Sequence, residues 1–460
     1  MPKYEYLHHR IRNDIRTGIL AGNTKLPSKR ALSQHLDISV STVEQAYDLL
    51  ISESYIYSKP GSGYYVCPNR NEGTYQNVKE EIEKSGEGDI TVFDMKANHS
   101  PQELFPAETW ARLMRKTLSD HHPELYDTIP FNGLFALRQA IASYLYEFKG
   151  IRATPDQIVI GAGTEYLYGR LLQLFGSRCT IGIGDYGSKN LFNVSQGTGT
   201  RWEYFHVDSD GLNLDTLDES PVDAVHVSPA NHFPTGVAMS QRRRKQLLDW
   251  AHREPQHYII EDDYDSELRY SGRPAASLFA QDNGEKVIYL NTFSKTLVPS
   301  IRISYMVLPF PLMELYTKQL SFYSCTVSSF EQYTLAQFIS GGYFERHIMR
   351  LRRFYDKRMS IVIEAFEKSP LMKIATLKEV EVGTHLLLHV NTRYSDSQIR
   401  EAAARENIHL AMLSDYCARD SVYNNGYLVI NVASIVSGQV EDVVHALQKV
   451  FEEDINRNAN

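Results

Sequence analysis

Cysteine is scarce in this chain of 460 residues. The four cysteines, Cys67, Cys179, Cys325 and Cys417, lie far apart and form no C-x-x-C pair. This spacing argues against a disulfide framework and against a zinc site built from paired cysteines. We therefore expect no metal site and a protein of a reducing compartment.

Long apolar runs are also missing. No stretch of about 18 apolar residues occurs, so no membrane span is expected. Residues 1–10 are polar and contain no apolar signal region. Hydrophobic residues make up 42% and charged residues 23% of the chain. This is ordinary globular composition and predicts a cytoplasmic protein of several domains.

Excess positive charge is absent from the chain as a whole, since the net charge is −8. The charge is nevertheless uneven. Residues 1–70 hold nine Lys/Arg and six Asp/Glu, a balance of +3, whereas the remainder holds 39 and 50, a balance of −11. This asymmetry permits a DNA-binding segment at the N-terminus and a larger body that does not face phosphates.

The first 68 residues have the pattern of a small DNA-binding domain. Apolar residues at helical spacing from Tyr4 to Ile19 predict a helix over 4–20. Ser28 can cap a second helix, and Ser39 or Ser41 a third, with Ser41 and Glu44 as a capping box. Two short strands, 55–58 and 63–66, flank a turn at 59–62. Helix, helix, tight turn, helix and hairpin is the order of a winged helix-turn-helix.

The rest of the chain predicts a different architecture. Residues 69–89 are polar and predict a linker. From residue 90 onward, helical patterns alternate with short apolar strands, which favours a doubly wound α/β domain with a mostly parallel sheet. The last hundred residues mix strands and helices, which predicts a smaller α+β lobe. The expected strands are 157–160, 179–183, 224–227, 258–260 and 287–290, followed by 385–390 and 427–432.

Two strand ends carry polar groups that suit a ligand. The strand in YIIEDDY (258–264) delivers carboxylates and a tyrosine, and the next strand ends in NTFSK (291–295). Ligands of open α/β sheets bind at such ends. A desolvated lysine can form a Schiff base, and Arg302 can hold a phosphate. Alone, the carboxylates also fit a metal site or a solvated turn, and Lys295 also fits a surface lysine.

A third signal is the glycine-rich GAGT at 161–164, which is placed at a strand-to-helix junction. Backbone N–H groups and the helix dipole there can bind a phosphate. Turns of this kind occur in many α/β proteins, so this motif is the least specific of the three.

The N-terminal motifs resemble the head of the GntR regulators. The matching segments are LPSKRAL (26–32), SVSTVEQAY (39–47) and KPGSG (59–63). Val40 departs from the arginine usual in the family. A valine can contact a thymine methyl but cannot form the bidentate hydrogen bonds that an arginine makes with guanine. The resemblance implies double-stranded DNA as partner. It implies DNA contacts by Lys29, Arg30, Ser39, Ser41, Thr42 and Gly63.

The whole chain resembles the MocR branch of that family, in which the head is fused to a fold-type I aminotransferase-like domain that binds pyridoxal phosphate. Asp262, Tyr264, Lys295 and Arg302 have the order and approximate spacing of that domain. The resemblance implies that Lys295 binds the aldehyde, Asp262 the pyridine nitrogen and Tyr264 the ring oxygen. It also implies ring stacking by Tyr186 and phosphate binding by Gly163, Thr164, Thr292, Ser294 and Arg302.

Other positions are less clear. Asn231 or His232 stands near the position of the asparagine that contacts the ring oxygen in aminotransferases. Tyr186 is one of 29 tyrosines and also fits an ordinary half-buried residue. The strand at 427–432 has no arginine to bind a substrate carboxylate, and Ser188 is not a cation. Ser300 and Ser304 replace glycines that are usual around the phosphate arginine.

These departures favour a regulator over an enzyme. We expect a regulator that senses pyridoxal phosphate itself and controls vitamin B6 metabolism. A regulator that responds to an amine or amino acid reacting with the bound cofactor, and an active aminotransferase with an accessory head, stay as alternatives. The resemblance further implies a homodimer, and a two-fold dimer predicts paired half-sites in the DNA.

Overall fold

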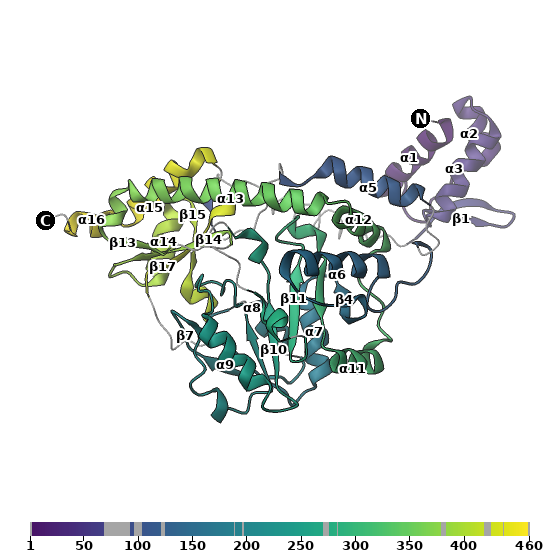
Figure 1. The fold of residues 1–460 in the computed structure, drawn as a ribbon. Coiled ribbons are helices and arrows are strands. Elements are labelled where there is room, and N and C mark those ends of the chain that lie inside the picture. The colour runs from purple at the N-terminus through teal and green to yellow at the C-terminus, as the bar shows by residue number, and fades with distance from the viewer. Residues whose placement is uncertain are drawn as a thin grey trace. The chain divides into compact units, whose positions relative to one another are not determined.

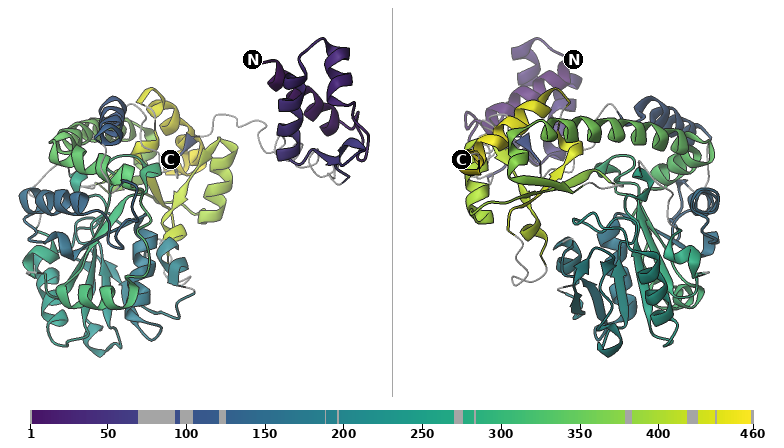
Figure 2. Two further views of the ribbon diagram at one scale, coloured as in Figure 1. Left: turned by 90° about the vertical axis from the view of Figure 1, so that its right-hand side faces the viewer. Right: turned by 60° about the vertical axis from the view of Figure 1, so that its left-hand side comes forward.

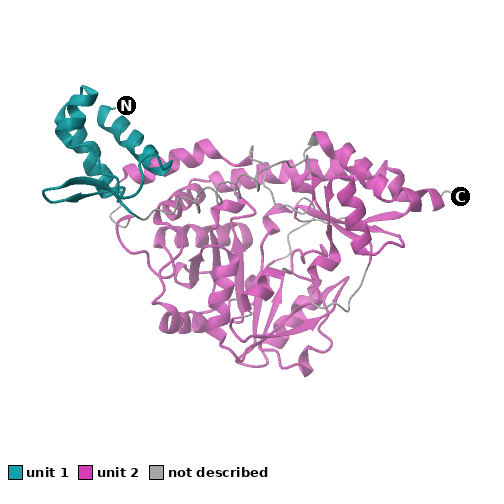
Figure 3. Cartoon of the chain, turned by 180° about the vertical axis from the view of Figure 1, so that it is seen from behind, with its two compact units in different colours: residues 1–90 teal, residues 91–460 magenta. Residues whose placement is uncertain are grey.

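The chain divides into two compact units, Met1–Ile90 and Thr91–Asn460 (Figure 3). The predicted linker at 69–89 lies outside the described residues, as does Ser188. No described helix combines the length and the apolar character that crossing a membrane requires. The computed structural model describes residues 2–68, 93–95, 104–120, 125–187, 189–195, 197–269, 276–282, 284–378, 383–417, 425–435 and 437–458.

The first unit has the order of elements predicted for a winged helix-turn-helix. The stripe Val43, Ala46, Tyr47 and Leu50 of the third helix is buried in its core. A two-stranded antiparallel hairpin follows. The elements are α1 (Lys3–Arg16), α2 (Lys29–Leu36), α3 (Val40–Ser52), β1 (Ile56–Lys59) and β2 (Gly63–Val66).

Two local predictions in this unit were wrong. The first helix ends at Arg16, and Ile19, which was placed on its apolar face, is 72% exposed beyond that end. Ser39 caps α3 by accepting the backbone N–H three residues on. Ser41 therefore lies inside the helix and forms no capping box with Glu44, because such a box requires the serine to precede the first turn.

A seven-stranded sheet forms the centre of the second unit, in the order β4-β12-β11-β10-β9-β5-β6. All its strands run the same way except β12, which pairs antiparallel with β11 and β4. This confirms the mostly parallel sheet. The strands are β4 (Ile158–Gly161), β5 (Thr180–Gly184), β6 (Arg201–Phe205), β9 (Ala224–Val227), β10 (Tyr258–Asp262), β11 (Val287–Thr292) and β12 (Ser304–Val307).

Helices cover both faces of this sheet (Figure 2). Successive side chains of a strand point to opposite faces. Thus Val287 and Tyr289 of β11 enter one core, whereas Ile288 and Leu290 enter another. The first core contains α5 (Ala107–Ser119), α6 (Phe135–Lys149), α9 (Gln241–Ala251), α10 (Leu278–Gln281) and α12 (Ser329–Ser340). The second contains α7 (Thr164–Phe175), α8 (Lys189–Ser195) and α11 (Phe310–Leu320).

The predicted α+β lobe is present at the end of the chain and has its own core. Its antiparallel sheet has the order β13-β14-β17-β16. The long helix α13 (Tyr343–Glu367) joins the two cores (Figure 1), since Phe344 packs in the first and Phe366 in that of the lobe. The other helices and strands of the lobe are β3 (Phe93–Asp94), β13 (Ala375–Lys378), β14 (His385–Val390), α14 (Asp396–Arg405), β15 (Ile408–His409), β16 (Ala411–Met412), β17 (Tyr427–Asn431), α15 (Val440–Val450) and α16 (Glu452–Asn458).

Candidate cofactor pocket and DNA-binding surface

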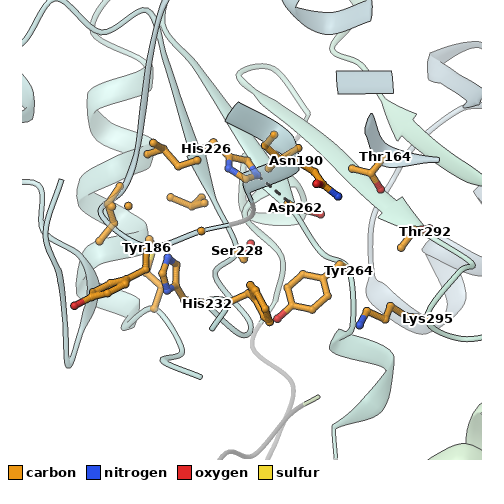
Figure 4. A pocket seen from close by; sticks show the side chains of 18 of the residues that line it. Thr164, Tyr186, Asn190, His226, Ser228, His232, Asp262, Tyr264, Thr292 and Lys295 are labelled. Atoms are coloured by element: carbon orange, nitrogen blue, oxygen red, sulfur yellow. Dashed lines mark ion pairs between the residues drawn. The ribbon is translucent and has the colours of Figure 1, made fainter. Parts of the chain in front are cut away.

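The sheet brings the predicted pocket residues to one edge. The parallel strands all end at this edge, and the antiparallel β12 begins there. Asp262 is the last residue of β10, Thr292 the last of β11, and Arg302 stands two residues before β12. These ends surround a cavity of about 290 Å³ (Figure 4). Its lining includes eight of the ten predicted residues: Thr164, Tyr186, Asp262, Tyr264, Thr292, Ser294, Lys295 and Arg302.

Asp262 faces this cavity beside a histidine that the sequence analysis did not select. Its Oδ2 lies 3.7 Å from Nε2 of His226, a buried residue of β9 (Figure 4). That nitrogen has no hydrogen-bond partner among the described residues. The signal in the sequence was a histidine within an otherwise apolar strand, which is an uncommon place for a titratable group.

The two carboxylates next to Asp262 point away from the cavity. Glu261 accepts hydrogen bonds from two backbone N–H groups at the start of α10, at 3.0 and 2.9 Å. Burial raises the pKa of Glu261 to about 7. Asp263 instead pairs with Nζ of Lys149 at 2.6 Å. The three carboxylates of the acidic run therefore do not converge on one point.

Tyr264 and Asn231 contact each other directly. The Tyr264 hydroxyl donates to the Asn231 carbonyl at 3.1 Å and accepts from Asn231 Nδ2 at 3.1 Å. The same Nδ2 donates to Asp265 Oδ2 at 2.8 Å. Oδ1 of Asn231 is buried, with no hydrogen-bond partner among the described residues. Of the two residues considered for the ring oxygen, Asn231 is the one that lies against Tyr264.

Lys295 follows β11 and is subject to two opposing effects. Burial lowers the pKa of the Lys295 amine, and the nearby charge of Asp265 acts to raise it. Burial in turn raises the pKa of Asp265. An amine whose pKa lies below the usual lysine value is a better nucleophile at neutral pH. Asp265, three residues beyond Asp262, was not among the predicted residues.

The cavity also offers donors for an anion. Gly163 precedes α7 with φ +98°, and a Cβ there would lie 2.2 Å from Nη2 of Arg302. A side chain at this position would push that guanidinium aside, and the positive φ itself favours glycine. Ser294 Oγ is buried and has no hydrogen-bond partner among the described residues. Thr292 Oγ1 accepts from the Ser294 N–H at 3.2 Å and from Ser304 Oγ at 2.8 Å.

Tyr186 is not brought to the same place. Its side chain lies beside His232 at one end of the pocket, whereas Lys295 and Thr292 lie at the other end (Figure 4). The stacking role that the resemblance implies for Tyr186 stays a prediction.

Taken together, the described donors suit a small aromatic aldehyde that carries a phosphate. They include a half-buried amine, a carboxylate for a ring nitrogen and an amide–phenol pair for a ring oxygen. A glycine at the start of a helix, an arginine and an unpartnered serine hydroxyl are available for the phosphate. Guanidinium groups and hydroxyls at a helix N-terminus are the groups that bind phosphates in proteins.

In the first unit, the predicted DNA contacts lie at the starts of α2 and α3 and at the hairpin. Arg30 and Ser41 are exposed. Ser39 Oγ lies 2.9 Å from Ser41 Oγ and 2.7 Å from Thr42 Oγ1. Gly63 begins β2 with φ +111°. Hydroxyls and free N–H groups at a helix N-terminus are suited to phosphate contacts.

Lys29 has a partner that the sequence did not reveal. Its Nζ lies 2.6 Å from Oε1 of Glu44 on α3. This hydrogen bond raises the pKa of Lys29. A phosphate would therefore compete with Glu44 for this cation.

Two further cations lie against the hairpin: Lys59 belongs to it, and Lys25 precedes α2 and pairs with Tyr65 in a β-bridge. Nζ of Lys59 lies 4.8 Å, and that of Lys25 5.9 Å, from the ring centre of Tyr65. Lysines held over an aromatic ring keep their charge exposed, so the hairpin adds positive charge to this unit.

Comparisons with known proteins divide the chain in the same way. Residues 3–66 match the family described as bacterial regulatory proteins, gntR family, and residues 90–447 match aminotransferase class I and II. The HTH-type transcriptional regulator YdeL of Bacillus subtilis is 35% identical over 90% of this chain and 89% of its own length. The HTH-type pyridoxine biosynthesis transcriptional regulator PdxR of Corynebacterium glutamicum is 30% identical over 89% and 88%.

A third relative and one solved structure complete the comparison. The "Probable rhizopine catabolism regulatory protein MocR" of Rhizobium meliloti is 29% identical over 90% of this chain and 87% of its own length. Among solved structures, a kynurenine aminotransferase of Pyrococcus horikoshii aligns with a TM-score of 0.72 and 22% identity, covering 82% of this chain and 94% of that one. At this identity the likeness establishes the aminotransferase fold.

Proposed function

The chain belongs to the aminotransferase class I and II family and carries a gntR-family head, and we propose that this DNA-binding regulator senses pyridoxal phosphate itself. Its relatives over nearly the whole length are transcriptional regulators. The cofactor of its large unit is pyridoxal phosphate. One relative is named for pyridoxine biosynthesis, and we assign this chain to the control of vitamin B6 metabolism.

We assign the pocket residues to the cofactor as follows. When bound, pyridoxal phosphate supplies an aldehyde that a lysine can capture and a ring that withdraws electrons. Lys295 presents the amine, and Asp262 holds the proton of the ring nitrogen. Tyr264 and Asn231 orient the ring hydroxyl. The remaining assigned residues hold the phosphate or the ring face: Gly163, Thr164, Thr292, Ser294, Arg302 and Tyr186.

One observation favours the cofactor itself as the signal. Among the described residues that line the pocket, the only Lys and Arg side chains are Lys295 and Arg302. Both are needed for the cofactor, and β17 supplies no arginine. An α-amino acid would thus lack the bidentate partner that orients a carboxylate.

A second candidate signal is an amine without a carboxylate. Asp265 lies near Lys295 and accepts from Asn231. Asp265 can accept a hydrogen bond from an amine, whereas the pocket offers no second arginine for a carboxylate among its described lining residues. Steady turnover of an amino acid with a keto acid would instead support an active aminotransferase.

By analogy with its fold, we propose a homodimer that binds paired half-sites. A two-fold dimer presents two copies of α3, so the DNA site should have matching symmetry. In the head, we assign the DNA contacts to Lys29, Arg30, Ser39, Ser41, Thr42 and Gly63.

The test measures DNA binding by the full chain with and without pyridoxal phosphate. Fluorescence anisotropy would follow a labelled fragment from the region upstream of the chain's own coding sequence. We expect pyridoxal phosphate alone to change the affinity by about fivefold or more, which is the lower end of ordinary allosteric coupling. Lys295→Ala should abolish the change, whereas Lys318→Ala, at an exposed lysine of α11, should preserve it.

The outcomes separate the candidates. Identical DNA affinity of the apo and cofactor-loaded protein would refute the sensing proposal. A response that appears only after an amine is added would select the amine-responsive regulator. Borohydride reduction followed by peptide mapping should find the pyridoxyl group on Lys295, and its presence on another lysine would overturn the pocket assignment.

A further inference from the structure

A carboxylate lies on the arginine assigned to the phosphate. Oε2 of Glu165 is 2.7 Å from Nη2 of Arg302. The guanidinium lies against Gly163, because a Cβ on that glycine would be only 2.2 Å from Nη2. Glu165 is thus placed where an anion bound to Arg302 would also lie.

The same carboxylate engages the start of α7. Burial alone would raise the pKa of Glu165, but the net effect is a lower pKa. Its own backbone N–H and the side chains of Arg302 and Asn190 lower it by hydrogen bonding. Glu165 is therefore ionised at neutral pH. It uses both the guanidinium and the helix N-terminus, the two kinds of donor that suit a phosphate.

This ion pair contributes little to the stability of the fold. The side chain of Arg302 is 50% exposed and that of Glu165 37% exposed. Exposed pairs of this kind contribute at most about 1 kcal/mol, because water and salt screen them. Such a pair can yield to a doubly charged phosphate, yet that phosphate must first displace it. The pair thus adds little to the stability of the fold but can compete with the phosphate for Arg302.

We propose that Glu165 sets the affinity for pyridoxal phosphate by competing with its phosphate for Arg302 and the start of α7. The proposal rests on the proposed function only in requiring that the large unit binds this cofactor. A sensor needs an affinity near the concentration that it reports. The Glu165 carboxylate weakens binding of pyridoxal phosphate without altering the residues that contact the ring.

The experiment compares Glu165→Gln with the unmodified full chain in two titrations followed by visible absorbance. One uses pyridoxal phosphate and the other uses pyridoxal, which lacks the phosphate. We expect Glu165→Gln to lower the dissociation constant for pyridoxal phosphate by about twofold to fivefold, the range that exposed ion pairs span. The constant for pyridoxal should not change. Glu441→Gln, at an exposed glutamate in the first turn of α15, is the matched control.

A second pair of variants tests the route of the effect. In an Arg302→Ala background, Glu165→Gln should tighten binding of pyridoxal phosphate clearly less, because only the start of α7 then remains as a shared partner. An unchanged or weaker affinity of Glu165→Gln for pyridoxal phosphate would overturn the proposal. So would an equal shift for both aldehydes, or a full effect without Arg302. If the unmodified chain bound neither aldehyde, the cofactor assignment would fail, which is a different result.

Discussion

The amine of Lys295 lies where burial and a neighbouring acid act on it in opposite directions. Burial lowers the pKa of Lys295, and Asp265 raises it. Asp265→Asn removes the second effect, so the pKa of Lys295 should fall further. Because only the unprotonated amine attacks an aldehyde, the pH profile for adduct formation with pyridoxal phosphate should move to lower pH. The measurement is the rate at which visible absorbance appears across a pH series.

Asparagine keeps an oxygen that can accept from Asn231, so the local hydrogen bond can survive this change. Asp442→Asn, at an exposed position of α15, is the control for loss of one negative charge. A profile that stays in place, or that moves to higher pH, would contradict the electrostatic role assigned to Asp265.

Gly163 offers a second prediction at the scale of one residue. Its φ of +98° disfavours any side chain, and a Cβ there would lie 2.2 Å from Arg302 Nη2 and so would push the guanidinium aside. In Gly163→Ala, the strained backbone should cost about 1–3 kcal/mol of stability. Loss of one charged hydrogen bond from the displaced arginine, about 1.5–3 kcal/mol, should weaken binding of pyridoxal phosphate by about tenfold or more, with a smaller loss for pyridoxal. Gly169→Ala is the matched control, because a Cβ there makes an ordinary 3.5 Å contact with Val194. Equal affinity of both variants for pyridoxal phosphate would contradict the role assigned to Gly163.

At the scale of elements, α2 and α3 are connected by the pair Lys29–Glu44, at 2.6 Å. Glu44→Gln frees the cation for a DNA phosphate. We expect tighter DNA binding and a plot of log affinity against log salt that is steeper by about 0.9, the value for one added phosphate contact on duplex DNA. Asp48→Asn removes the same charge from an exposed position of the same helix without touching Lys29. If both variants gave the same slope, general charge rather than Lys29 would be responsible.

The elements also show how far sequence patterns reach. β9, β10 and β11 were predicted because a buried parallel strand is a short apolar run between helices. β12 was missed because only one 3-10 turn, Pro299–Ile301, separates it from β11, and this breaks the alternation of strands with long helices. β6 was missed because it is an edge strand whose residues are mostly only partly buried and include two charged side chains, Arg201 and Glu203.

For the pocket, motif order selected Asp262, Tyr264, Lys295 and Arg302, all of which line the cavity. It could not select His226, Asp265 or Glu165, because their roles depend on contacts made across the sheet rather than along the chain. Glu165 and Arg302 are separated by 137 positions in the sequence. Local pattern also placed Glu44 in a capping box, whereas the contact between α2 and α3 gives it a different partner.

At the scale of the whole molecule, a head that binds DNA and a body that binds a cofactor form a regulator only if the two binding events are coupled. Coupling of this kind is reciprocal, since both events share one thermodynamic cycle. If pyridoxal phosphate changes DNA affinity by a given factor, the DNA site must change pyridoxal phosphate affinity by the same factor.

We therefore expect a shift of about fivefold or more in the cofactor's dissociation constant when the specific fragment is present. Titration of the full chain by visible absorbance, with that fragment or with unrelated DNA of equal length, measures it. Unrelated DNA should have a smaller effect, because contacts to the phosphate backbone alone do not require the specific arrangement of the heads in the proposed dimer. Glu165→Gln should tighten cofactor binding equally with and without DNA, because it acts on the pocket and not on the coupling. If the specific fragment left the cofactor's dissociation constant unchanged, the two sites would not be coupled, and the chain would carry two separate functions.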